Sequence, residues 1–201
     1  MKYEIRNTKY DFKKGLTRGA RARQGFTVLE SIVAIFVLSL SISGAFSAVR
    51  QSLNQSILSK EEVKAFYLAQ EVVEIIRNKR DTNQLARIND GTTGWLDVIT
   101  GNATDYCYFG KVCKIDISNY DFVSLGSTYC GNSWDSCPIL RQNQDDFRYG
   151  YYADWVATNF KREIMFESIN ADEVAVIVRI TWTKGITTKE FKIKTHLFNR
   201  I

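Results

Sequence analysis

The group whose chemistry is most out of place in this sequence is a single carboxylate, Glu30. It is the only charged residue in an apolar run at positions 26–49, FTVLESIVAIFVLSLSISGAFSAV. An acidic side chain inside a bilayer costs roughly 2.5–3.5 kcal/mol on insertion scales. A carboxylate retained at that cost predicts a counter-charge on a partner. The alternative is a capping box, for which Thr27 and Glu30 have the right spacing at the start of a helix.

Four cysteines form the second group of reactive side chains: Cys107, Cys113, Cys130 and Cys137. Four cysteines allow three disulfide connectivities, of which the pairing of neighbours, 107 with 113 and 130 with 137, is the simplest. An even number in an oxidising compartment favours disulfides. A four-cysteine zinc site is the alternative, although such sites usually have the shorter C-x2–4-C spacing. We therefore expect disulfides and no metal.

The remaining polar residues give no catalytic pattern. His196 is the single histidine, so a metal site with two histidines is excluded, and we expect it to be a solvated surface residue. The pair Asp145 and Asp146 is expected to face water, with a calcium loop as the alternative. The sequence has no Walker A, dinucleotide-binding, G-x-S-x-G or H-E-x-x-H motif. We predict no enzymatic activity and no cofactor.

A segment rich in aromatic and basic groups follows the acidic pair, with Arg148, Tyr149, Tyr151, Tyr152 and Trp155. We interpret these as core and loop aromatics. Binding of DNA or a glycan is the alternative, because bases and sugar rings contact aromatic side chains.

The apolar run that holds Glu30 is long enough to cross a membrane. As a helix its 24 residues span ~36 Å, against a hydrocarbon core of ~30 Å. A buried helix of a soluble protein is less consistent with a segment that is apolar on all sides. A secretory signal cleaved near residues 45–47 is a further alternative, but the apolar centre of a signal peptide is only ~7–15 residues long.

The charge of the chain is concentrated before this run. Residues 1–25 hold eight basic and two acidic side chains, which gives +6, so the rest carries −1 of the chain's net +5. The basic character is therefore local, and nucleic-acid binding through overall charge is not favoured. By the positive-inside rule, residues 1–25 lie in the cytoplasm and the remainder outside.

The sequence RQGFTVLE at positions 23–30, between a basic leader and an apolar span, resembles the processing signature of type IV prepilins and type II secretion pseudopilins. In that family a membrane aspartyl peptidase cleaves after the glycine and methylates the new N-terminal phenylalanine. The resemblance implies cleavage between Gly25 and Phe26, N-methylation of Phe26, and a role in assembly for Glu30. The glutamate then neutralises the new α-amine of a neighbouring subunit.

The stretch at positions 65–83 is similar to the helix exit of PilV-like minor pilins, and Ser47 lies near the position where many major pilins have a kinking proline. The resemblance implies a minor or priming subunit of a pilus used in adhesion, motility or DNA uptake. Its partners would be prepilin peptidase, other pilin subunits through helix–helix packing, the inner-membrane assembly platform and the lipid bilayer. Before assembly the chain would be a single-pass cytoplasmic membrane protein, and afterwards part of an extracellular pilus or the cell surface.

The sequence is also compatible with two alternatives. One is a type II secretion pseudopilin. The other belongs to a different class, a single-span membrane-anchored adhesin or sensor that never polymerises and keeps residues 1–25.

Beyond the apolar run, helical periodicity continues. We expect one helix over residues 26–80, continuous past a possible capping box at 59–62 and ending at 81–83. Strands are expected at 106–117 and 160–169, a loop at 126–138, and an antiparallel hairpin over 174–182 and 191–197 with its turn at 183–185.

The sequence thus predicts an α+β fold with a long N-terminal helix on a C-terminal antiparallel sheet, as pilins have. Its parts are a removed leader (1–25), a transmembrane helix half (26–49), an amphipathic helix half (50–82) and a β-rich extracytoplasmic head (83–201).

Overall fold

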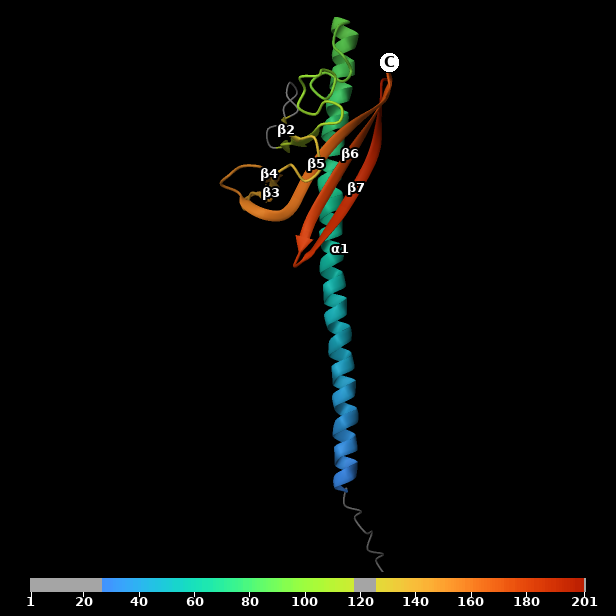
Figure 1. Cartoon of the computed structure of the whole chain (residues 1–201), viewed down its shortest axis with the longest axis vertical. Coiled ribbons are helices and arrows are strands. Elements are labelled where there is room, and N and C mark those ends of the chain that lie inside the picture. The colour runs from blue at the N-terminus through green and yellow to red at the C-terminus, as the bar shows by residue number, and fades with distance from the viewer. Residues whose placement is uncertain (1–26, 118–125, 201) are drawn as a thin grey trace, which may run out of the picture. The chain divides into compact units, whose positions relative to one another are not determined.

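A computed structural model describes residues 27–117 and 126–200 of the chain. Its contacts divide the chain into two compact units, Met1–Gln51 and Ser52–Ile201. The described part is an α+β structure with one long helix followed by an antiparallel sheet (Figure 1). The expected combination of an N-terminal helix and a C-terminal antiparallel sheet is confirmed.

Helix α1 runs without interruption over Val28–Asp90, 63 residues. The expected continuity past residues 59–62 is confirmed, because no proline or glycine interrupts this stretch. The expected end at residues 81–83 is wrong. Within that range, the polar side chain of Asn83 is buried, and its Nδ2 donates to the carbonyls of Trp95 (3.3 Å) and Asp97 (2.8 Å).

The helix ends at a glycine that adopts the left-handed conformation. Gly91 has φ of 68°, and its N–H donates to the carbonyl of Arg87 at 2.8 Å, as in an αL C-cap. The Asp90 carboxylate accepts hydrogen bonds from the backbone of Thr92 and Thr93 and from the Thr93 hydroxyl. These bonds lower the pKa of Asp90 from 3.8 to about 2 and turn the chain away from the helix axis.

In the described residues, seven strands form one sheet: β1 (Val112–Ile115), β2 (Ser127–Gly131), β3 (Ile139–Gln142), β4 (Tyr149–Gly150), β5 (Val156–Asn170), β6 (Glu173–Lys184) and β7 (Thr187–Phe198). All pairs are antiparallel. The long strand β5 is central. Along one edge it pairs with β3 near its start and with β1 further on, and along the other edge it pairs with β6.

The C-terminal hairpin is confirmed, with Lys184 opposite Thr187 as its last pair. Its turn lies one residue later than expected, with Gly185 at φ 61° in the first loop position, where a type II′ turn places glycine. Two other expectations need correction. The segment 106–117 is a strand only over β1, and the expected loop at 126–138 contains β2, which is paired to β1 despite its glycine and serine residues.

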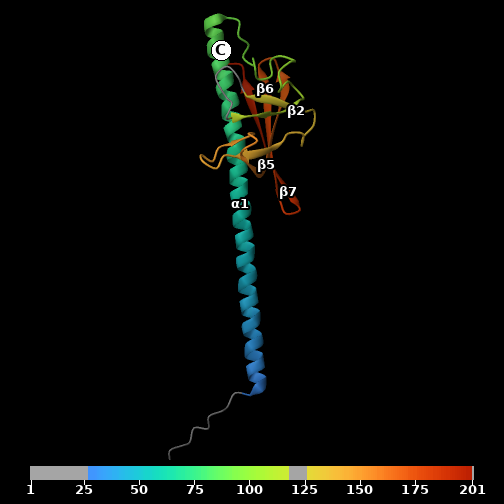
Figure 2. The same ribbon diagram turned by 90° about the vertical axis from the view of Figure 1, so that its left-hand side faces the viewer.

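The core lies between one face of α1 and the sheet, whose strands lie along the green part of the helix in Figures 1 and 2. The helix contributes Ala65, Leu68, Ala69, Val72, Val73 and Ile76, all buried. Alternate residues of β5 and β6 meet this stripe, among them Ile164, Phe166, Val176 and Val178. Two-residue alternation on the strands and helical spacing on α1 together produce a single apolar layer.

Candidate functional site

The N-terminal part of α1 is exposed on every side. All residues from 27 to 57 are exposed, and this stretch includes large apolar side chains such as Ile35 (63%), Phe36 (61%) and Phe46 (64%). In the described part of the chain, α1 is the one helix that is long and apolar enough to cross a membrane. Apolar surface of this extent is stable in lipid or against other helices, and unfavourable in water.

Glu30 lies in the first turn of this helix. The Thr27 hydroxyl oxygen accepts a hydrogen bond from the Glu30 N–H at 3.2 Å, so the first half of the expected capping box is present. The Glu30 carboxylate has no hydrogen bond or ion pair with any residue in 27–117 or 126–200. The positive end of the helix dipole favours a carboxylate in this turn, but the charge itself has no counter-ion in the described chain. Gly25 and Phe26, the predicted cleavage pair, lie outside the described residues.

Serine hydroxyls in the same segment are satisfied locally. Ser39 donates to the Ile35 carbonyl at 2.8 Å and Ser41 to the Val37 carbonyl at 2.9 Å, each four residues back. Such bonds remove the cost of exposing a hydroxyl to lipid. Glu30 therefore differs from these polar neighbours, because its charge is not neutralised within the helix.

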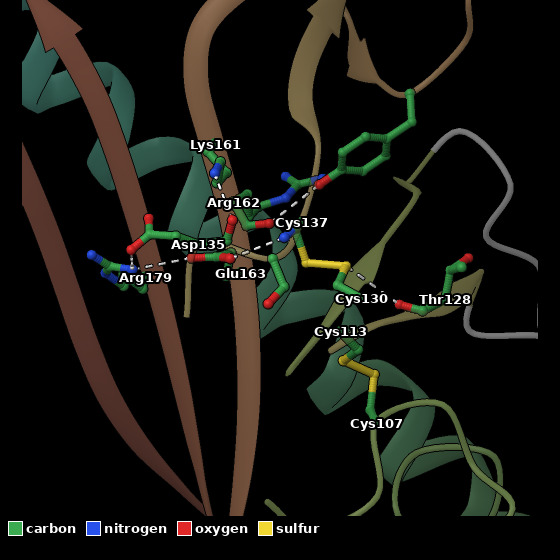
Figure 3. The surroundings of a disulfide bond; sticks show 12 residues. Cys107, Cys113, Thr128, Cys130, Asp135, Cys137, Lys161, Arg162, Glu163 and Arg179 are labelled. Atoms are coloured by element: carbon green, nitrogen blue, oxygen red, sulfur yellow. Dashed lines mark hydrogen bonds and ion pairs between the residues drawn. A yellow bond between two sulfur atoms is a disulfide. The ribbon is translucent and has the colours of Figure 1, made fainter. Parts of the chain in front are cut away.

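The four cysteines form two disulfides between neighbours, Cys107–Cys113 and Cys130–Cys137 (Figure 3). Both bonds lie in the unit that begins at residue 52, and together they use all four cysteines. This excludes the four-cysteine zinc site. The two bonds differ in exposure: Cys107 and Cys113 are fully buried in the core, whereas Cys130 is partly accessible.

The second disulfide closes a loop that is held to the outer face of the sheet by a charge network (Figure 3). The buried Glu163 carboxylate accepts from the Cys137 N–H (3.1 Å) and from the Arg179 guanidinium (3.2 Å). Arg179 also pairs with Asp135 of the loop (3.1 Å) and with Glu190 (2.6 Å). Each buried charge thus has at least one partner of opposite sign, which such burial requires.

A second buried charge connects the helix to the sheet. Arg162 is fully buried and donates to the carbonyls of Leu68 (3.3 Å) and Ile115 (3.0 Å) and to the Glu71 carboxylate (3.3 Å). Sequence reasoning missed both Arg162 and Glu163. A signal was available for Arg162, since alternation places it on the same strand face as Phe160 and Ile164, where an unpaired charge would be costly.

The other residues singled out from the sequence are distant from Glu30 in the chain, and they do not form a common site. His196 is on the polar face of β7, as expected, where its Nδ1 lies 2.7 Å from Glu173 Oε1. Asp145 and Asp146 are exposed, as expected, and Arg148 pairs with Asp146 at 2.6 Å. The backbone N–H of Arg148, with its guanidinium, lowers the pKa of Asp146. No group of three or more His, Cys, Asp or Glu side chains is placed to hold a metal in the described ranges.

The aromatic residues after the acidic pair divide into two groups. Tyr149 and Tyr151 pack against the core, and burial raises the pKa of the Tyr151 phenol. Tyr152 and Trp155 lie on the loop before β5 with their ring centroids 4.9 Å apart. The interpretation as core and loop aromatics is consistent with this arrangement.

No protein-family model, curated protein or solved structure matches this chain.

Proposed function

We propose that this chain is a structural subunit of the type IV pilin class, most similar to a PilV-type minor pilin, with no enzymatic activity of its own. The observation that carries the proposal is Glu30, the single charged residue of the apolar run at positions 26–49. Glu30 has no ionic partner in the described chain, although it lies in a surface of large apolar side chains. A carboxylate in that environment has a function that a membrane anchor alone would not require.

The residues around Glu30 supply the missing counter-charge after processing. Cleavage between Gly25 and Phe26 removes the +6 leader and creates an α-amine at Phe26. Glycine before the cleaved bond leaves the backbone accessible to a narrow peptidase cleft. In a polymer of this chain, the amine of one copy pairs with Glu30 of its neighbour, and the low dielectric around the helices strengthens that attraction.

In this proposal the two parts of the chain have different roles. The exposed apolar segment of α1 first occupies the lipid bilayer and then packs against the same segment of other pilin subunits. Residues 52–201 form a disulfide-containing unit with its own core, which supports the assignment of this unit to an oxidising, extracytoplasmic compartment. The partners of this proposal are prepilin peptidase, the inner-membrane assembly platform and the other subunits.

The decisive experiment is the intact mass of the protein after co-expression with a prepilin peptidase. We expect a mature chain that begins at Phe26 and carries one added methyl group. Gly25→Val should block processing, because its branched side chain hinders the extended backbone in the cleft. Gly19→Val, which changes another leader glycine, is the matched control and should be processed normally. A chain that retains Met1, or begins near residue 48, would overturn the proposal.

A second experiment tests the role of the charge itself. Glu30→Gln should be cleaved like the native chain but should enter filaments poorly, because the subunit amine then has no counter-ion. Glu62→Gln, which removes an exposed carboxylate from the same helix, should assemble normally. Normal incorporation of Glu30→Gln would contradict the assembly role.

Where the mature chain is found separates the remaining alternatives. Recovery in sheared surface filaments supports a pilus, whereas retention in the periplasm with secretion components supports a type II pseudopilus. An unprocessed chain found only in the membrane supports a non-polymerising adhesin or sensor.

A further inference from the structure

A small cavity lies between the β3–β4 turn and the loop that leads into β5. Its lining includes Gln142, Asn143, Asp145, Asp154 and Trp155, and its volume is ≈ 200 Å³. That is below the roughly 300–1,000 Å³ of pockets for drug-sized ligands. The cavity therefore suits a single small ring. The mechanism proposed for Glu30 does not involve any of these residues.

The walls of this cavity are fixed by hydrogen bonds before any ligand binds. The Arg141 guanidinium donates to the carbonyls of Ala153 (2.9 Å) and Trp155 (3.0 Å), which attaches the loop to β3. On the opposite wall, the Asn143 N–H donates to the Arg148 carbonyl at 2.9 Å and closes the turn. Preformed walls reduce the ordering cost of binding.

The polar groups of the lining are only partly used. Gln142 donates its Nε2 to the Phe147 carbonyl, which leaves its Oε1 as an acceptor. Asn143 accepts through Oδ1 from the Asp145 N–H, which leaves its Nδ2 as a donor. The Asp145 and Asp154 carboxylates have no hydrogen-bonding partner within 27–117 and 126–200. The cavity therefore offers donors and acceptors side by side with the indole of a half-buried Trp155.

We propose that this cavity binds one pyranose ring of a glycan that carries no acidic group, and that it prefers a sugar bearing a free amine. Sugar hydroxyls donate and accept hydrogen bonds, which matches the amide and carboxylate groups. The C–H face of a pyranose packs on an aromatic ring, which matches Trp155. Two carboxylates in the lining attract an ammonium group and repel an anion.

The same lining argues against nucleic acid and other phosphate ligands. No Lys or Arg is part of the cavity wall. Of the nearby cations, Arg141 is engaged by two carbonyls and Arg148 by Asp146. Phosphate recognition depends on available cationic side chains. This inference does not depend on the pilin assignment, because it concerns residues 141–156 alone.

Saturation-transfer NMR on the full chain in lipid nanodiscs tests the proposal. Nanodiscs are required because glycoside detergents would compete for the site. The probes are glucosamine, glucose and glucuronic acid at equal concentration. We expect transfer to the ring protons of glucosamine and, more weakly, of glucose, and none to glucuronic acid.

Two variants assign the signal to the cavity. Trp155→Ala should weaken glucosamine binding about tenfold, the upper range of an aromatic contact, whereas the matched control Trp134→Ala should leave it unchanged. Trp134 is also a half-buried loop tryptophan, but it contacts Arg179 and Lys192. Asp154→Asn leaves Asp145 as the remaining carboxylate of the lining. It should therefore reduce the preference for glucosamine over glucose while glucose still binds.

Three results would overturn the proposal. The first is the absence of transfer to both glucosamine and glucose. The second is binding of glucuronic acid as tight as that of glucosamine. The third is unchanged binding in Trp155→Ala.

Discussion

The two parts of helix α1 have the same backbone structure but different surroundings. Between residues 27 and 57 every side chain is exposed, whereas between residues 65 and 83 one face is buried against the sheet. In the second part, burial explains why the helix is stable. In the first part, residues 27–117 and 126–200 supply no such cover. The difference implies that the first part depends on lipid or partner helices, and the second on the sheet.

The largest expected effect comes from removing core volume in the second part. Ile76→Ala should lower the free energy of unfolding of residues 52–201 by about 2–5 kcal/mol, because Ile76 is fully buried and a cavity is left behind. All four tryptophans lie in this unit, so a guanidinium titration followed by tryptophan fluorescence reports on it. Ile35→Ala, at an exposed position of the first part, should leave that titration unchanged. Equal effects of the two substitutions on the free energy of unfolding would show that the two parts of α1 do not differ in this way.

Next in size is the contrast between two glutamates. Glu163 is buried with Arg179 and the Cys137 N–H as partners, whereas Glu30 has none in the described chain. Glu163→Gln should therefore lower the free energy of unfolding by about 1–3 kcal/mol in the same fluorescence titration. Glu167→Gln, at an exposed ion pair with Lys194, is the control and should cost below about 1 kcal/mol. If Glu163→Gln left the free energy of unfolding unchanged, the network would not be what holds the disulfide loop.

A smaller effect is expected at Gly91, the glycine that ends helix α1. Gly91→Ala should lower the free energy of unfolding of residues 52–201 by about 1–2 kcal/mol, since an alanine is strained at φ 68°. Gly44→Ala is the matched control, because a Cβ there meets nothing within 4 Å and the glycine lies inside the exposed helix. Circular dichroism at 222 nm during thermal unfolding distinguishes the two. A lower melting temperature for Gly44→Ala would show unrecognised contacts in the first part.

The smallest effect is a pH dependence of the free energy of unfolding, confined to residues 52–201. Burial raises the pKa of Tyr151, whose hydroxyl donates to the Arg162 carbonyl at 3.4 Å. A raised pKa means that the neutral phenol is favoured in the folded state. This stabilisation is complete below pH ~10 and is lost as the pH rises through the folded-state value.

An alkaline series of guanidinium titrations measures this loss, which Tyr151→Phe should reduce. The control Tyr67→Phe, at an exposed tyrosine, should leave it as in the native chain. Residues 27–57 contain no tyrosine, so their helicity should not change over that range. A steeper alkaline loss in Tyr151→Phe would contradict the assignment.

The features predicted from sequence are those determined by local pattern. Helical periodicity, the alternation in β6 and β7, and the pairing of neighbouring cysteines all depend on residues close together in the chain. The single carboxylate of the apolar run was also visible in the sequence, because it interrupts a uniform composition.

The features missed depend on distant contacts. The helix continues past the expected end at residues 81–83, because the carbonyls of Trp95 and Asp97 accept the amide protons of the Asn83 side chain. Strand β2 lacks an apolar alternation and exists because β1 offers it an edge. The burial of Glu163 depends on Arg179, its cross-strand partner in β6.

The position of β5 in the sheet has a consequence for biosynthesis. Its neighbours β1, β3 and β6 do not pair with one another in the structure, so the complete sheet requires residues 156–184. The two disulfides join cysteines only six and seven residues apart and lie upstream of that strand. Short loops bring their ends together in well under a microsecond, although forming the disulfide itself takes seconds to hours. Neither crosslink therefore needs the completed sheet to bring its two cysteines together.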